Sequence, residues 1–256
     1  MSKFFPIRLL EREDFAPGVM RLCFVRDDGQ PLDYTPGQFI QIHFPLGDGE
    51  VARRSYSLAT RHDHAIAVGE AVEFIASVVP GGRATALFQG MAIGESLQAT
   101  GPMGLFTLKP DDSNTRYLLI ATGTGVASYR SMLPDLDQRL AEQPGLSIVL
   151  MHGARSPAEL LFADEFADFA RRHGARFRYL ACLSRELPAA DAPLAAEINV
   201  RHGYVQNFLA DVAPQAEGDI AYLCGNPNMV DACVEALKGH GLPMKHIRRE
   251  KYVSLR

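Results

Sequence analysis

Apolar and polar residues follow one rhythm before residue 108 and another after it. In Gln38–Phe44, Ile40, Ile42 and Phe44 fall on every second position, which is the period of a strand with one buried face. Residues 54–59 and 72–79 are further strand candidates, and 84–89 is a candidate short helix. Turn residues separate these segments at 16–18, 35–37, 47–49, 80–82 and 101–102. This spacing predicts a small antiparallel barrel or sandwich.

After a polar, turn-rich segment at 109–115 the pattern becomes strand then helix, repeated. Strands are expected at 117–121, 147–152, 177–183 and 219–224, and helices at 126–140, 157–173 and 227–238. In the second helix Phe162, Phe166 and Phe169 would form one apolar face. Alternation of this kind predicts a doubly wound parallel sheet with helices on both faces. We therefore expect two domains, residues 1–108 and 109–256.

Composition and charge narrow the classes of function. With 47% hydrophobic and 22% charged residues, the 256-residue chain can build a sizeable core. A net charge of −4 argues against a nucleic-acid binder. The four cysteines are scattered, so neither a metal site nor an iron–sulfur ligand set is expected. No signal peptide and no apolar run of about 18–20 residues is visible, which favours a cytoplasmic protein away from membranes.

The segment Arg54-Ser55-Tyr56-Ser57 combines a cation, an aromatic ring and hydroxyl groups on one predicted strand. Strand alternation places Arg54 and Tyr56 on one face and the two serines on the other. A guanidinium can grip a diphosphate, and a phenol ring can lie flat on a conjugated ring. The segment is a candidate reader of a flavin dinucleotide. The alternative is an ordinary edge strand with a solvated arginine.

Two glycine loops end predicted strands of the second half. Thr122-Gly123-Thr124-Gly125 begins a Gly-x-Gly-x-x-Ser pattern, which partly matches the dinucleotide fingerprint. Cys224-Gly225-Asn226-Pro227 closes the last predicted strand, and both loops should lie at the carboxyl edge of the sheet. Cys224 could instead be a small buried residue ending a strand.

Two turns of the first half are less specific. Gly82-Arg83-Ala84-Thr85 enters the predicted short helix, where backbone N–H groups, a guanidinium and a hydroxyl could hold a second phosphate pair. A plain helix cap with a solvated arginine explains it equally well. Gly101-Pro102-Met103-Gly104 is interpreted as a tight turn in a domain-linking loop.

In this order the five segments resemble the ferredoxin–NADP reductase superfamily, and most closely its small bacterial ferredoxin/flavodoxin–NADP reductases. The resemblance covers nearly the whole chain, and the ordered set is specific although each segment alone is not. It implies an N-terminal FAD-binding antiparallel β-barrel and a C-terminal NADP-binding α/β domain. The expected reaction is hydride transfer between NADP(H) and FAD, followed by single-electron transfer to ferredoxin or flavodoxin.

The resemblance also implies roles for residues. Arg54 would hold the FAD diphosphate, Tyr56 would stack on the isoalloxazine and Ser57 would lie near its N5, with Ser55 between them. The second flavin phosphate segment would be Gly82, Arg83, Ala84 and Thr85. The diphosphate of the pyridine nucleotide would meet Thr122, Gly123, Thr124 and Gly125, and its nicotinamide would lie beside Cys224 and Gly225.

A choice of NADP over NAD needs a cation for the 2′-phosphate. Arg155 and Arg185 each follow a predicted strand end, as in NADP-specific bacterial members, so we expect NADPH to be preferred. Either arginine could be surface charge. Near the C-terminus, Tyr252 is expected against the flavin face with Glu250 nearby, and residues 253–256 would have to move for hydride transfer. Ser57, Cys224, Glu250 and Tyr252 are best described as positioning groups.

The electron acceptor is expected to be a separate molecule, because the chain has no iron–sulfur ligand set. Acidic ferredoxin or flavodoxin would need a basic docking face. Candidate cations are Arg53, Arg83, Arg248, Arg249 and Lys251, which could equally be scattered surface charge. A reductase serving an oxygenase, a haem protein or free flavin is the alternative enzyme, and a flavin- or nucleotide-binding regulator is the non-enzymatic one. A monomer is expected.

Overall fold

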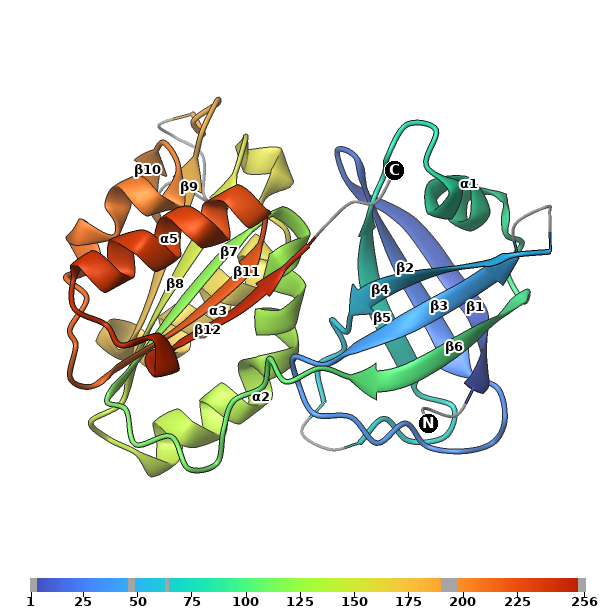
Figure 1. The fold of residues 1–256 in the computed structure, drawn as a ribbon, viewed down its shortest axis with the longest axis horizontal. Coiled ribbons are helices and arrows are strands. Elements are labelled where there is room, and N and C mark those ends of the chain that lie inside the picture. The colour runs from blue at the N-terminus through green and yellow to red at the C-terminus, as the bar shows by residue number, and fades with distance from the viewer. Residues whose placement is uncertain (1–3, 46–48, 63–64, 190–197, 253–256) are drawn as a thin grey trace. The chain divides into compact units, whose positions relative to one another are not determined.

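The protein folds into two compact units. The computed structural model describes residues 4–45, 49–62, 65–189 and 198–252. The first unit runs to Leu108 and also takes in Ala127–Asp135, and the second comprises Lys109–Val126 and the chain from Leu136 onward. Each unit is built on its own six-stranded sheet (Figure 1).

The sheet of the first unit is antiparallel throughout. Its strands are β1 (Phe4–Ala16), β2 (Val19–Arg26), β3 (Phe39–Pro45), β4 (Val51–Ser57), β5 (Ala71–Ser77) and β6 (Ser96–Met103). They pair in the order β4-β3-β6-β1-β2-β5. A bridge between Leu58 and Phe74 joins the two ends of this order, so the sheet curls back on itself. The predicted antiparallel barrel is confirmed.

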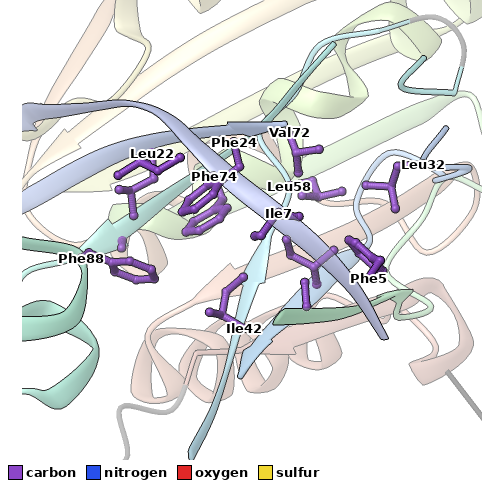
Figure 2. Packing of buried hydrophobic residues seen from close by; sticks show 14 of the residues in the cluster. Phe5, Ile7, Leu22, Phe24, Leu32, Ile42, Leu58, Val72, Phe74 and Phe88 are labelled. Atoms are coloured by element: carbon purple, nitrogen blue, oxygen red, sulfur yellow. The ribbon is translucent and has the colours of Figure 1, made fainter. Parts of the chain in front are cut away.

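Alternate side chains of these strands fill the barrel. Ile40, Ile42 and Phe44 are buried as the period of two predicted. Phe24 and Phe74 stack at the centre with ring centroids 5.4 Å apart (Figure 2). Helix α1 (Arg83–Gly90) packs on this core through buried Phe88. The core therefore fixes β4 and α1, the two elements that carry the predicted flavin segments.

Part of the barrel differs from the prediction. Gly101 and Pro102 lie inside β6 and not in a domain-linking turn, because the strand continues its pairing with β3 as far as Met103, opposite Phe39. Strand β1 was not expected at all. Its second half is polar, yet it keeps its pairing with β2 through two register shifts. Backbone pairing, which composition does not reveal, makes both segments strands.

The second unit holds a parallel sheet. Its strands are β7 (Arg116–Thr122), β8 (Ser147–Ala154), β9 (Phe177–Leu183), β10 (Asn199–His202), β11 (Asp219–Gly225) and β12 (Ile247–Lys251), in the order β10-β9-β8-β7-β11-β12. All five pairings are parallel, so every strand ends at one carboxyl edge. The chain order reverses between β7 and β11, which is where such sheets bind ligands.

Helices cover both faces of this sheet, as predicted. Helix α5 (Pro227–Gly239) packs on one face through Val230, Cys233 and Leu237 (Figure 1). Helix α3 (Ala163–His173) covers the other, with the ring of Phe166 5.8 Å from that of Tyr179. Helix α2 (Ala127–Glu142) follows β7 through a short 3₁₀ turn at Gly123–Val126.

The helix predicted from Pro157 to His173 begins later than expected. Pro157–Glu159 forms a separate 3₁₀ turn, and Phe162 then takes a left-handed φ of 57° before α3 starts at Ala163. A bulky residue in that conformation ends any helix arriving from the N-terminal side. Phe162 thus precedes the helix. Of the three phenylalanines predicted to form one face, Phe166 and Phe169 lie on the buried face of α3.

Candidate functional site

Strand β4 holds Arg54 and Tyr56 side by side on one face of the barrel wall. They stand opposite Ile42 and Ile40 in the antiparallel register. The half-buried Tyr56 ring stacks on Phe74 with centroids 4.7 Å apart and meets Phe88 edge-on at 5.5 Å. Burial raises the pKa of Tyr56 to about 12 despite the opposing charge of Arg54. The phenol is therefore neutral at ordinary pH, and its ring is held by the core.

The two serines of this segment sit in different surroundings. Ser57 is buried at the end of β4. Ser55 is exposed, and its hydroxyl accepts a hydrogen bond of 3.3 Å from the Gln41 side-chain amide. Of the two hydroxyl groups, only that of Ser57 is shielded from solvent.

A tight turn at Gly82 leads into α1. A Cβ on Gly82 would lie 2.9 Å from the carbonyl oxygen of Val79, so a larger residue would push this turn apart. The Thr85 hydroxyl accepts a hydrogen bond of 2.9 Å from the Val79 N–H. This bond connects the first turn of α1 to the segment that follows β5. Arg83 is exposed at the same end. The first N–H groups of a helix have no partner within it and attract anions.

The opposite end of α1 is fixed from the barrel. Arg12 donates through Nη1 to the carbonyl oxygens of Phe88 and Met91, at 2.6 and 2.8 Å. A guanidinium at a helix C-terminus satisfies free carbonyls and complements the dipole. Arg12 was not among the predicted site residues, because its partners are distant in sequence.

A buried ion cluster holds the segment that follows Ser57. Arg130 pairs with Glu73 at 2.8 Å and donates to the Ala59 carbonyl oxygen at 2.7 Å. Glu73 also accepts from Arg21 Nε at 2.8 Å, and its own carbonyl receives the Ala59 N–H. Glu73 and Arg130 are only 7% and 9% exposed. The cluster therefore fixes the exit of β4, and no local pattern in the sequence indicated it.

The two glycine loops of the second unit press against each other at the carboxyl edge. A Cβ on Gly125 would lie 2.4 Å from the Cys224 carbonyl oxygen, and one on Gly225 would lie 2.5 Å from that of Thr122. Gly225 also has a φ of +125°, which favours glycine. The Asn226 N–H donates to the Thr122 hydroxyl at 3.1 Å. The structure thus brings together the two loops predicted to hold a pyridine nucleotide.

Glu250 and Tyr252 lie beside Cys224. Strand β12 pairs with β11 so that Glu250 is opposite Cys224, and the Tyr252 N–H donates to the Gly225 carbonyl at 2.9 Å. Cys224 is fully buried, whereas Glu250 and Tyr252 are half-buried. These three predicted residues therefore form one group at the end of the sheet. Residues 253–256, predicted to move, lie outside the described residues.

Arg155 and Arg185 follow β8 and β9 on adjacent segments. The Arg155 carbonyl accepts from the N–H groups of Arg185 and Glu186, at 2.9 and 3.0 Å. The Arg155 guanidinium is paired with Glu159 through Nε and Nη2, both at 2.8 Å, and this hydrogen bonding raises its pKa. The segments that carry the two arginines are therefore adjacent, and the Arg155 guanidinium already has an anionic partner.

An exposed ring on the same edge was missed by the sequence analysis. Tyr204 follows β10 and is 61% exposed. The next residue, Val205, would lie 2.9 Å from a Cβ on Gly153, so this loop abuts the end of β8. Tyr204 was not recognised as a residue at this edge of the sheet, because the four-residue strand β10 that precedes it was not predicted. An aromatic side chain there is available for stacking.

The candidate docking cations have different surroundings. Arg248 forms two hydrogen bonds to Asp112, at 2.7 and 2.5 Å, and another to the Tyr222 hydroxyl. Burial opposes ionisation of Asp112, but Arg248 together with hydrogen bonds from the Lys109 N–H and the Tyr117 hydroxyl outweighs it, so the carboxyl pKa is lowered. Lys251 pairs with Asp231 at 2.6 Å. Arg53, Arg83 and Arg249 are exposed. The expectation that Arg248 offers an open docking charge is wrong, because Asp112 holds its guanidinium.

Two features are absent from the described residues. No three His, Cys, Asp or Glu side chains among them lie together as a metal-binding group. None of their helices is both long and apolar enough to cross a bilayer.

Comparison with known proteins defines the class. Residues 6–108 match the oxidoreductase FAD-binding domain, and residues 119–235 match the oxidoreductase NAD-binding domain. Together with the fold these matches define an FAD- and NAD(P)-dependent reductase that transfers electrons. The chain is 34% identical over 257 residues to ferredoxin–NADP reductase B of Sorangium cellulosum, with 97% of each protein covered. It belongs to the ferredoxin–NADP reductase superfamily.

Other relatives are reductases of oxygenase systems. The chain is 34% identical over 248 residues to the reductase subunit of an aromatic O-demethylase from an Amycolatopsis strain, covering 95% of this chain and 68% of that protein. It spans 60% of the propane 2-monooxygenase reductase component of Mycolicibacterium smegmatis. A crystal structure of an Amycolatopsis cytochrome P450 reductase, GcoB, matches with a TM-score of 0.79 and 32% identity, covering 98% and 71% of the two chains. The relatives therefore fall into two functional groups.

Proposed function

We propose that the protein is a ferredoxin/flavodoxin–NADP reductase, with an FAD domain at residues 1–108 and an NADP domain at residues 109–256. It transfers hydride between NADP(H) and FAD and passes single electrons to ferredoxin or flavodoxin. The observation that carries this proposal is the alignment over 97% of both chains with a ferredoxin–NADP reductase. A monomeric, cytoplasmic protein is part of the same proposal.

The first unit offers a fitting cradle for FAD. Gly82 permits the tight turn in which a Cβ would meet the Val79 backbone, and the α1 N-terminus with Arg83 and Thr85 supplies anion-binding groups. Arg54 is the second cation for the diphosphate, and Tyr56 is an aromatic platform held from behind by Phe74. Ser55 and Ala84 contribute backbone, and Ser57 lies at the buried end of β4.

The second unit offers a matching cradle for the pyridine nucleotide. Thr122, Gly123, Thr124 and Gly125 line the turn that enters α2, where the helix dipole favours a diphosphate. The neighbouring backbone of Cys224 and Gly225 approaches closely because neither Gly125 nor Gly225 carries a Cβ. Arg155 and Arg185 are the proposed cations for a 2′-phosphate, so NADPH is preferred over NADH. Tyr204 is proposed to stack on the adenine.

Chemistry at this site needs position more than proton transfer. When bound, the two cofactors supply hydride transfer and the division of an electron pair into single electrons. The protein's residues orient the reacting rings, which is a proximity effect. Cys224 is fully buried, so we assign it the role of fixing the loop beside the nicotinamide and not that of an acid. Ser57, Glu250 and Tyr252 are likewise positioning groups, and Tyr252 is held by the Gly225 carbonyl.

A reductase serving an oxygenase or haem protein is the second candidate. It is favoured by the 34% identity to the O-demethylase reductase subunit and by the 32% identity to the cytochrome P450 reductase structure. Both candidates share the flavin and nucleotide halves. They differ only in the protein that accepts the electrons.

Anaerobic reduction of the flavin tests the proposal. Purified protein should be yellow, and NADPH should bleach it within seconds. The reduced protein is then offered ferredoxin, flavodoxin and an oxygenase or P450 partner from the same source. Fastest reduction of ferredoxin or flavodoxin supports the first candidate, and fastest reduction of the oxygenase partner replaces it with the second. A yellow protein that neither NADPH nor NADH can bleach would be a binding protein and not a reductase.

A further inference from the structure

The short segments 155–159 and 185–186, which follow β8 and β9, carry two carboxylates and two guanidinium groups. We call Arg155, Glu159, Arg185 and Glu186 the arginine corner. Their formal charges sum to zero. Backbone hydrogen bonds from Arg185 and Glu186 to the Arg155 carbonyl hold the two segments together. A site for a doubly charged phosphate would ordinarily be expected to carry excess positive charge.

Glu159 occupies the edge of Arg155 that best fits an anion. Its two carboxylate oxygens meet Nε and Nη2 of Arg155, each at 2.8 Å, and the Arg155 N–H adds a third contact at 3.3 Å. This is the bidentate geometry that a phosphate would otherwise use. The Glu159 side chain is 19% exposed, against 54% for Arg155, so the carboxylate is the more firmly held partner.

We infer that Glu159 limits the preference for NADPH by competing with the 2′-phosphate for the Arg155 guanidinium. This inference rests on the proposed function and names a specificity-determining residue of the same site. A 2′-phosphate must either displace Glu159 or bind Arg155 through its remaining nitrogen. In both cases it also meets the negative charge of the carboxylate.

The size of the effect follows from electrostatics. An exposed ion pair is worth little by itself, because water screens it. A carboxylate roughly 6 Å from a doubly charged phosphate weakens its binding by about tenfold at low ionic strength. Removing the charge while keeping the shape should therefore strengthen binding of a 2′-phosphate by about three- to tenfold. A nucleotide without that phosphate should change by less than about twofold.

The test compares Glu159→Gln with Glu186→Gln, which makes the same charge change in the same corner without breaking a bidentate pair. The full chain with its flavin bound is titrated calorimetrically with 2′,5′-ADP and with 5′-AMP at low and high salt. Glu159→Gln should raise affinity for 2′,5′-ADP only, and more than Glu186→Gln does. The same variant should raise the ratio of kcat/KM for NADPH to that for NADH.

A double-mutant cycle with Arg155→Met separates competition for Arg155 from general repulsion. The gain from Glu159→Gln should be clearly smaller when Arg155 is already methionine, because only the direct repulsion between carboxylate and phosphate then remains. A gain that is undiminished in the Arg155→Met background overturns the inference, and so does an unchanged or weakened affinity for 2′,5′-ADP in Glu159→Gln. Failure of the proposed reductase activity looks different, because neither nucleotide would then bleach the flavin of the unmodified protein. A different electron acceptor would leave these nucleotide titrations unchanged.

Discussion

Replacing Gly125 with alanine tests whether the two glycine loops are packed as the structure has them. The added Cβ would lie 2.4 Å from the Cys224 carbonyl oxygen, 2.7 Å from its carbon and 2.9 Å from the Gly225 Cα. Ordinary contacts of a Cβ begin at 3.4 Å. The Cys224–Gly225 backbone must therefore move by about 1 Å, and overpacking of this kind costs roughly 1–3 kcal/mol of unfolding free energy. For a unit of this size the melting temperature should fall by roughly 4–12 °C.

The same displacement should impair nucleotide use more than flavin binding. A misplacement of about 1 Å at a reacting centre can cost roughly 100-fold, so kcat/KM for NADPH should fall between about 10- and 100-fold. Bound FAD, proposed to lie in the first unit, should be retained. Gly239→Ala is the matched control, because no heavy atom lies within 4 Å of its Cβ. Wild-type melting and wild-type kcat/KM in Gly125→Ala would refute the packing, and lowered melting with unchanged kcat/KM would remove the loops from the nucleotide site.

Two further predictions concern buried charge. His152 is fully buried, which lowers its pKa to about 3, so the unfolded chain binds a proton below pH 6.5 that the folded one does not. Stability present above pH 6.5 is therefore lost as the pH falls, by about 2 kcal/mol between pH 7 and pH 5. Urea unfolding of His152→Gln should show a flatter acid limb, and an unchanged slope would contradict this. In the first unit, Arg130→Met should lower unfolding free energy by roughly 3 kcal/mol, because Glu73 loses a buried partner. Breaking the exposed Arg8–Asp27 pair with Arg8→Met should cost less than about 1 kcal/mol, and equal losses would show that burial is not decisive.

Much of the fold was visible in local patterns. Alternation at Ile40, Ile42 and Phe44 predicted β3, and glycines at the ends of two apolar strands predicted the loops that the sheet brings together at its carboxyl edge. These features depend on the conformational freedom of glycine and on the alternation of side chains along a strand. Both can be recognised from residues that are adjacent in the sequence. The order of the five segments then indicated the superfamily, which the comparisons confirm.

Errors arose where pairing partners are distant or where one residue changes the backbone path. Gly101 and Pro102 were predicted to form a turn, but they continue β6, because this part of β6 pairs with β3. Phe162 was predicted to be part of a helix, but it has a left-handed backbone conformation and precedes α3. Arg248 was a candidate for an exposed docking charge, but its guanidinium is bound by Asp112, which lies 136 residues earlier in the chain.

By itself the sequence determined the two kinds of sheet, the strand that carries Arg54 and Tyr56, and the glycine turns that let backbone approach backbone. Each of these follows from the chemistry of adjacent residues. Only the tertiary structure decided which charges meet: Arg130 with Glu73 beneath β4, and Arg155 with Glu159 at the arginine corner. The reason is that an ion pair is defined by where folding leaves two side chains and how much water remains between them, and neither quantity is a property of a short stretch of chain.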